Sequence, residues 1–178
     1  LSTDITLDDV ETTSLSISTA SYGGFALSGA DGVNDVLNTS ELKTLTLSAA
    51  SYGDITVDDI VDAEELQTIS VTATGESADV AIDDIGTGTN STALASVTLS
   101  ATAGGTIDTG TITTTANLST VSVTADGANS NITSTGALVT NGGGISSLTI
   151  AATDRATVDM TGMDMTVGAG LVAATSIS

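Results

Sequence analysis

A short pattern of alternating hydroxyl and aliphatic side chains recurs along this chain of 178 residues. With Φ for an aliphatic residue, it reads Ser/Thr-Φ-Ser/Thr-Φ-Ser/Thr, and successive copies begin 24 to 30 residues apart. The copies are SLSIS at Ser14–Ser18, TLTLS at Thr44–Ser48, TISVT at Thr68–Thr72, SVTLS at Ser96–Ser100, TVSVT at Thr120–Thr124 and, with one alanine, SLTIA at Ser147–Ala151. Alternation with a period of two residues is typical of β-strands that bury one face.

Each copy is followed by a turn containing Gly, Ala or Asn and then by a second apolar alternation. The first two complete units share a Ser-Tyr-Gly turn, at Ser21–Gly23 and Ser51–Gly53, and DITLDDV at Asp4–Val10 returns as DITVDDI at Asp54–Ile60. A unit of this length cannot bury its apolar face alone, so we expect the units to stack. The sequence therefore predicts an all-β fold, a parallel β-solenoid of about six to seven coils with roughly 24–30 residues per coil.

Stacking also predicts which side chains form the interior of the solenoid. The inward columns are expected to be Leu15, Leu45, Ile69, Val97, Val121 and Leu148, and beside them Ile17, Leu47, Val71, Leu99, Val123 and Ile150. Two tandem immunoglobulin-like sandwiches are the competing architecture, but they would not require one pattern in every unit. We therefore expect residues 1–178 to form a single solenoid segment that belongs to a longer repeat array.

The composition argues against several classes of function. There are 22 acidic residues but only two cationic ones, Lys43 and Arg155, and the formal net charge is −20. Such a surface repels phosphate backbones, so no binding of nucleic acid is expected. No apolar run is long enough for membrane insertion. Histidine and cysteine are absent, which removes the usual nucleophile and proton-transfer groups, and we expect a protein that is not an enzyme.

Pairs of adjacent carboxylates recur at equivalent places in the repeat, at Asp8-Asp9, Asp58-Asp59 and Asp83-Asp84. Adjacent residues on an extended strand point to opposite faces, so neither Asp58-Asp59 nor Asp83-Asp84 would form a matched acid and base on one surface. Two interpretations remain open for the pairs. They are either solvated turn residues at strand ends, or ligands of a Ca²⁺ ion shared between neighbouring coils, with Asp58, Asp59, Asp83 and Asp84 as the metal-binding residues.

The polar loop SGADGVNDVLN, at Ser28–Asn38, is a second candidate Ca²⁺ site. In it, Asp31, Asn34 and Asp35 offer oxygen ligands beside two glycines. The letters NDVL at 34–37 resemble the end of the glycine-rich nonapeptide of RTX proteins, whose coils bind Ca²⁺. A loop of turn-forming Asp and Asn residues without a metal is the alternative interpretation.

Hydroxyl side chains dominate the outward face of the repeated strands. Seventeen of the eighteen outward positions in the six aligned copies are Ser or Thr, with Ala151 as the exception. These residues suit strands and remain neutral, whereas identical charges stacked in register would repel one another. The face could be a neutral strand surface, a surface for lateral packing into a lattice or filament, or a ladder that binds ice.

Taken together, the recurrent pattern, the Ser/Thr/Ala/Gly/Asp-rich composition, the scarcity of lysine and the absence of cysteine resemble the β-solenoid regions of bacterial surface-layer proteins and related large secreted RTX-type adhesins. The resemblance implies an extracellular protein of the cell surface that self-assembles, often with Ca²⁺, and cell-surface glycans as partners of an adhesin. We therefore expect a structural protein, and a ligand-binding solenoid for ice or glycan is the alternative.

Overall fold

The computed structural model describes most of the chain, and the regular secondary structure of the described residues consists of β-strands. The described residues are 2–4, 12–27, 41–61, 65–87, 93–114, 118–136, 138–140, 145–160, 165–167 and 175–177. Among them, no helix exists that is long and apolar enough to cross a membrane.

The strands form three parallel sheets, which contain seven, seven and five strands. The long sheet consists of β2 (Ser14–Ala20), β4 (Thr44–Ala50), β7 (Thr68–Thr74), β10 (Ser96–Thr102), β13 (Thr120–Asp126), β16 (Ser147–Thr153) and β19 (Thr175–Ile177). The second sheet consists of β1 (Ser2–Asp4), β3 (Gly24–Leu27), β5 (Asp54–Val57), β8 (Asp79–Ile82), β11 (Thr106–Thr109), β14 (Asn131–Ser134) and β17 (Thr157–Asp159). The third sheet consists of β6 (Ile60–Val61), β9 (Ile85–Thr87), β12 (Ile112–Thr114), β15 (Leu138–Thr140) and β18 (Met165–Val167).

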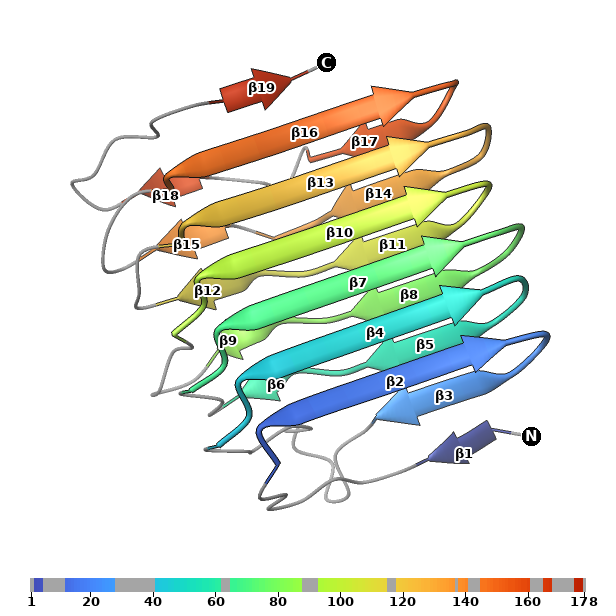
Figure 1. The fold of residues 1–178 in the computed structure, drawn as a ribbon, viewed down its shortest axis with the longest axis horizontal. Coiled ribbons are helices and arrows are strands. Elements are labelled where there is room, and N and C mark those ends of the chain that lie inside the picture. The colour runs from blue at the N-terminus through green and yellow to red at the C-terminus, as the bar shows by residue number, and fades with distance from the viewer. Residues whose placement is uncertain are drawn as a thin grey trace.

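Each coil of the chain visits the three sheets in the same order. A long strand is followed by a tight turn, a strand of the second sheet, a bend and a strand of the third sheet, and the next strand in the chain is again a long one (Figure 1). This arrangement confirms the predicted parallel β-solenoid. In the described residues five coils carry a strand in all three sheets, so complete coils are slightly fewer than the six to seven expected.

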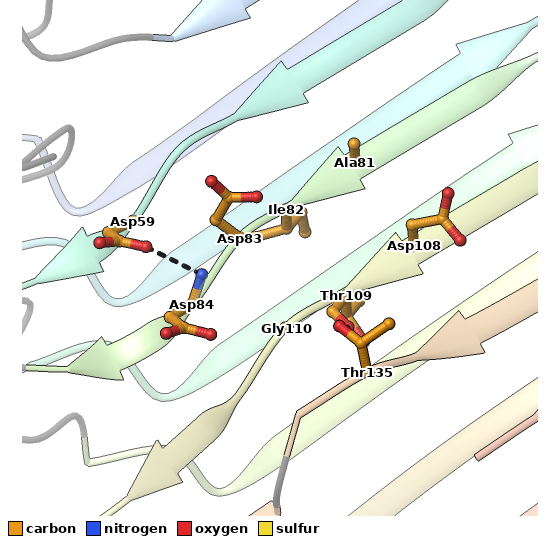
Figure 2. A pocket seen from close by; sticks show the side chains of 9 residues that line it. All are labelled: Asp59, Ala81, Ile82, Asp83, Asp84, Asp108, Thr109, Gly110 and Thr135. Atoms are coloured by element: carbon orange, nitrogen blue, oxygen red, sulfur yellow. Dashed lines mark hydrogen bonds between the residues drawn. The ribbon is translucent and has the colours of Figure 1, made fainter. Parts of the chain in front are cut away.

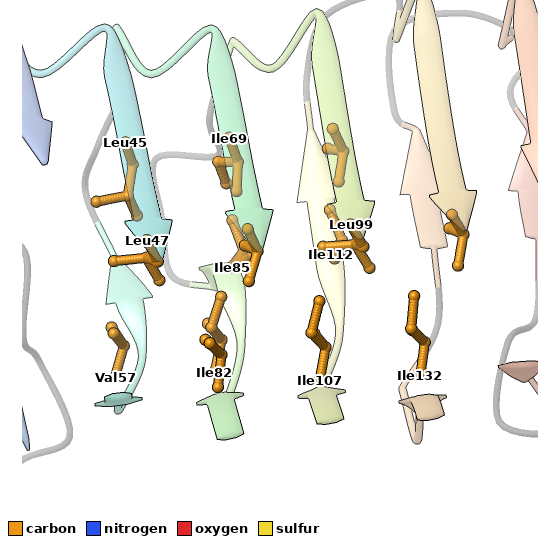
Figure 3. Packing of buried hydrophobic residues seen from close by; sticks show 14 of the residues in the cluster. Leu45, Leu47, Val57, Ile69, Ile82, Ile85, Leu99, Ile107, Ile112 and Ile132 are labelled. Carbon is orange, nitrogen blue, oxygen red and sulfur yellow. The ribbon is translucent and has the colours of Figure 1, made fainter. Parts of the chain in front are cut away.

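The pairing register stacks equivalent aliphatic residues above one another. Val97 of β10 pairs with Ile69 of β7 and with Val121 of β13, and Leu99 pairs in the same way with Val71 and Val123. All of these side chains are buried, and Figure 3 shows how such residues pack between the sheets. The predicted inward columns are therefore confirmed, and Val71 and Val123 lie in one column rather than in two separate sandwich cores.

The interior narrows toward the turn that joins the long sheet to the second sheet. Near this turn the buried residues of the long strands are small, namely Ala49, Ala73, Ala101 and Ala125. A Cβ atom at Gly105 would press against the backbone carbonyl of Ala73, so this coil has no room for a side chain at that position. At the opposite end the space is filled by buried leucines, including Leu42, Leu66 and Leu94.

The turns continue the hydrogen-bond ladder from one coil to the next. Ser21 and Tyr22 both have positive φ angles, 55° and 67°, and the N–H of Gly23 donates to the carbonyl of Ala20 at 3.2 Å. The N–H of Ser21 also donates to the carbonyl of Ser51 in the next coil, at 2.9 Å. The predicted Ser-Tyr-Gly turns are therefore confirmed, and they pair with each other as the strands do.

The stacked interior predicts that substitutions at neighbouring residues of β10 change the free energy of unfolding by very different amounts. Val97 is 1% exposed and points inward, whereas Thr98 is half-buried and points outward. Val97→Asp would bury an unpaired charge and should lower the free energy of unfolding by several kcal/mol. The control Thr98→Asp should change it by less than about 1 kcal/mol. Urea unfolding followed by circular dichroism measures both, and equal losses would contradict the inward assignment of Val97.

Candidate functional site

The paired carboxylates lie at the bend between the second and third sheets. Asp58-Asp59 joins β5 to β6, and Asp83-Asp84 joins β8 to β9. In the next coil the bend is formed by Gly110-Thr111, between β11 and β12. Because the flanking strands pair in register, each bend lies over the bend of the neighbouring coil. The carboxylates therefore occupy strand ends, as both sequence interpretations require.

At the bend, one carboxylate of each pair accepts a backbone hydrogen bond from the next coil. The N–H of Asp84 donates to Oδ1 of Asp59 at 3.1 Å, which Figure 2 shows as a dashed line. The N–H of Thr111 donates in turn to Oδ1 of Asp84 at 2.5 Å. Backbone N–H groups that are partly buried need an acceptor, and at this bend the side chain supplies it. Asp59 and Asp84 thus act as clamps between successive coils.

The clamp formed by Asp84 depends on a small residue in the coil that receives it. A Cβ atom at Gly110 would collide with the carbonyl of Asp83 and with Oδ1 of Asp84. The N–H of Gly110 also donates to the carbonyl of Asp83 at 2.7 Å. The carboxylate of Asp84 therefore fits against the next coil only because Gly110 lacks a side chain. In the following coil Gly136 is similarly crowded against the backbone of Gly110 and Thr111.

Four carboxylates line a surface depression around this bend. Asp59, Asp83, Asp84 and Asp108 contribute to its wall (Figure 2). The expectation that adjacent carboxylates point to opposite faces applies to a straight strand, but at the bend both Asp83 and Asp84 line one depression. The sequence interpretation missed Asp108, which β11 brings to the same surface at the outward position next to Ala81 in the pairing register.

The proposed Ca²⁺ ligands Asp58, Asp59, Asp83 and Asp84 lie at two successive bends. In the described part of the chain, no three Asp, Glu, His or Cys side chains gather closely enough to hold a metal ion. A Ca²⁺ ion at Asp58, Asp59, Asp83 and Asp84 therefore stays a prediction. The loop ligands Asp31, Asn34 and Asp35, and the pair Asp8-Asp9, lie outside the described residues.

Two buried hydroxyl residues follow each other in one column of the second sheet, and the first of them, Thr109, lines the depression. Thr109 and Ser134 are 3% and 6% exposed and occupy the column in which the preceding coils place Val57 and Ile82. Within the described residues, Oγ1 of Thr109 has no hydrogen-bond partner. A buried polar atom without a partner costs about 1–3 kcal/mol, so Thr109 fits this column less favourably than the aliphatic Val57 and Ile82 do.

A second polar feature links three coils at the turns. The rings of Tyr22 and Tyr52 stack with centroids 4.7 Å apart and planes inclined by 12°. Oη of Tyr52 donates to Oε2 of Glu76 at 3.1 Å. The hydrogen bond to Glu76 and, next, its negative charge raise the pKa of Tyr52 above its ordinary value of 10.0. The repeated Ser-Tyr-Gly turns were the sequence signal for the ring stack, whereas nothing in the pattern pointed to Glu76.

The clamp predicts that substitutions of Asp83 and Asp84 lower the free energy of unfolding by different amounts. Asp84→Ala removes the acceptor of the Thr111 N–H and should lower the free energy of unfolding by about 1–3 kcal/mol. Asp83→Ala, the matched control, removes an exposed carboxylate of the same charge and should change it by less than about 0.5 kcal/mol. Denaturant unfolding of both variants measures the difference, and a larger loss for Asp83→Ala would refute the clamp.

The tyrosine stack predicts a titration that can be followed in the ultraviolet, because the chain has only two tyrosines and no tryptophan. In a Tyr22→Phe variant, which keeps a ring in the stack, Tyr52 should ionise above pH 10.0. Adding Glu76→Gln should lower that midpoint, because the nearby negative charge is removed. Since folding raises this pKa, the contribution of the contact to stability is full below pH 10.0 and is lost as the pH rises through the folded-state pKa. An unchanged midpoint in the double variant would exclude the role of Glu76.

Comparisons of the chain with protein-family models, curated proteins and solved structures find no match. The sequence resemblance to surface-layer proteins and RTX-type adhesins therefore has no support from a relative. What the structure shows is a parallel β-solenoid whose carboxylates cluster at bends and whose long sheet carries hydroxyl groups.

Proposed function

We propose that this chain is a non-enzymatic structural repeat region of an extracellular protein of the cell surface, which self-assembles into a lattice or filament. The observation that carries the proposal is the distribution of charge. In a chain with a formal net charge of −20, the six seven-residue strands of the long sheet contain one charged residue, Asp126, at the end of β13. The long sheet is thus a broad neutral face on an acidic rod.

The acidic residues gather on the other surfaces of the solenoid. Asp54, Asp79, Asp108 and Asp159 belong to strands of the second sheet. Asp54 and Asp79 are direct partners in the pairing register, and both are exposed. Carboxylates on neighbouring parallel strands repel one another. Their concentration on one side favours a molecule in which opposite faces have different roles.

The architecture suits a structural role for a physical reason. Each coil contacts the coils before and after it, so the interior and the ladders repeat without a central core that limits length. Adding coils lengthens such a rod and enlarges its neutral face in proportion. A spacer, lattice element or filament needs this property, whereas an enzyme needs a fixed site.

The bend carboxylates also favour a structural role over catalysis. Asp59 and Asp84 accept backbone hydrogen bonds at 3.1 Å and 2.5 Å. A catalytic acid or base must be free to exchange protons with a substrate. Carboxylates that hold coils together are better explained as parts of the scaffold.

Binding of ice or glycan by the hydroxyl columns is the second candidate. The observation in its favour is that serine and threonine hydroxyls are aligned in register over several coils, as Thr46, Ser70 and Thr98 are. Growth of ice crystals in the presence of the protein distinguishes this function from self-assembly. Thermal hysteresis without association would favour the ice-binding alternative.

Calcium enters the proposal as a counter-ion of the acidic surfaces. Divalent cations reduce repulsion between carboxylates of neighbouring coils and copies. We expect millimolar Ca²⁺ to raise the melting temperature or to promote assembly, and chelation to reverse the change. An ion at one hundred times its dissociation constant stabilises the form it binds by about 2.7 kcal/mol. NaCl of equal ionic strength is the control, because screening alone also weakens repulsion. If NaCl reproduces the whole effect, specific binding of Ca²⁺ is excluded.

The test of the proposed function is electron microscopy of the concentrated protein with and without Ca²⁺. Regular sheets, bundles or filaments are the expected result, because neutral faces allow copies to pack side by side. Dispersed single rods at every protein and salt concentration would refute self-assembly.

A further inference from the structure

The hydroxyl columns of the long sheet are left unused by the fold. The middle outward column consists of Ser16, Thr46, Ser70, Thr98, Ser122 and Thr149. Within the described residues none of these hydroxyl groups has a hydrogen-bond partner. In the outward column at the turn end of the strands, by contrast, Thr102 donates to Thr74 at 3.2 Å, and Thr153 donates to Asp126 at 2.5 Å. The centre of the long sheet therefore presents donors and acceptors that remain available to a partner.

From this surface we infer that the long sheet packs face to face against the long sheet of a second copy of the chain, related by a two-fold axis in the plane between them. The inference rests on the proposed self-assembly and identifies its contact surface. A two-fold contact places the same patch on both sides. A hydroxyl group both donates and accepts, so identical hydroxyl columns can hydrogen-bond to each other without leaving a charge unpaired.

The charge distribution favours a second copy of the chain as the partner and the long sheet as the contact surface. Contact through the second sheet would bring Asp54, Asp79 and Asp108 of one copy against the same carboxylates of another. Contact through the long sheet places them on the far side of each solenoid, about 10 Å behind the interface if the sheets are spaced as usual. That distance exceeds the Debye length of about 8 Å at physiological ionic strength. Long-range repulsion between two acidic chains is therefore weakest in this arrangement.

The size of the face sets the expected strength of the contact. The six long strands span about 24 Å across the sheet and about 20 Å along the strands. Two such faces would bury roughly 1,000 Å², which is near the lower limit for a specific interface. A segment of this length should therefore associate weakly and reversibly. Each further coil adds about 100 Å² per copy, so longer arrays should associate more tightly.

A pair of matched charge substitutions tests the inference. Thr98→Glu places a carboxylate at the centre of the long sheet, where the neighbours in the column are Ser70 and Ser122. Thr56→Glu places the same charge at an exposed outward position of the second sheet, between Ala26 and Ala81. Thermal unfolding followed by circular dichroism establishes that both variants are folded. Sedimentation equilibrium then measures association of the unmodified chain and the two variants at low and high NaCl.

We expect the unmodified chain and Thr56→Glu to associate to a similar extent, and more strongly at high salt. Thr98→Glu should weaken association at least tenfold, because two buried carboxylates would face each other. Equal weakening by both substitutions, or none by Thr98→Glu, would overturn the inference but leave self-assembly in place. Absence of association in the unmodified chain at every salt concentration would overturn the inference and the proposed function together.

Single cysteines provide a second readout, because the chain has no cysteine of its own. In a face-to-face pair the middle column of one copy lies over the middle column of the other. Ser70→Cys, Thr98→Cys or Ser122→Cys should therefore form a covalent dimer with a flexible thiol-to-thiol crosslinker, because sheets packed face to face lie about 10 Å apart, which such a reagent can span. Thr56→Cys, on the second sheet, should remain monomeric. Crosslinking of Thr56→Cys to the same extent as the other three would refute the assigned face.

Discussion

The parallel ladder, in register from coil to coil, is the constraint on which the other features of this molecule depend. Because equivalent residues of successive coils lie about 4.8 Å apart, each side chain is placed against copies of its own position. Aliphatic side chains stacked in this way pack against one another, as in the column from Leu45 through Ile69 to Val97. Identical charges would repel, so hydroxyl groups occupy the outward positions of the long strands. The carboxylates are displaced to turns, to bends and to the shorter strands.

The same repetition explains which residues fill the interior. The space is narrow at the turn, where alanines such as Ala73 pack, and wider at the opposite end, where leucines such as Leu66 pack. A large ring would have to fit this taper between close neighbours above and below. The two tyrosines instead lie at the exposed turns, where stacking in register brings Tyr22 and Tyr52 face to face. Stacking of successive turns in register thus places equivalent aromatic rings in contact where the turns leave space for them.

The period-two alternation was sufficient to predict the strands and the inward columns, because both follow from burial of one face. The recurrence of the pattern every 24 to 30 residues predicted the parallel stacking. The role of the bend could not be predicted in this way. Whether Asp84 meets the N–H of Thr111 depends on the register of the next coil and on the space left by Gly110, and neither is a local property of the sequence. The Glu76 contact was missed for a similar reason, since it joins turns with different sequences, Ser-Tyr-Gly and Gly-Glu-Ser.

In the proposed assembly, the separation of charge would let the high net charge select the surface through which copies meet. A uniformly acidic rod would repel its copies from every direction, and a neutral rod could associate through any face. Here carboxylates such as Asp54 and Asp79 disfavour contacts through the second sheet, while the long sheet carries almost no charge. Specificity arises from such differences between the favoured contact and its competitors. In the proposed pair of copies, repulsion on the acidic faces would limit the ways in which the copies can meet, and the hydroxyl columns would need to supply only a modest attraction.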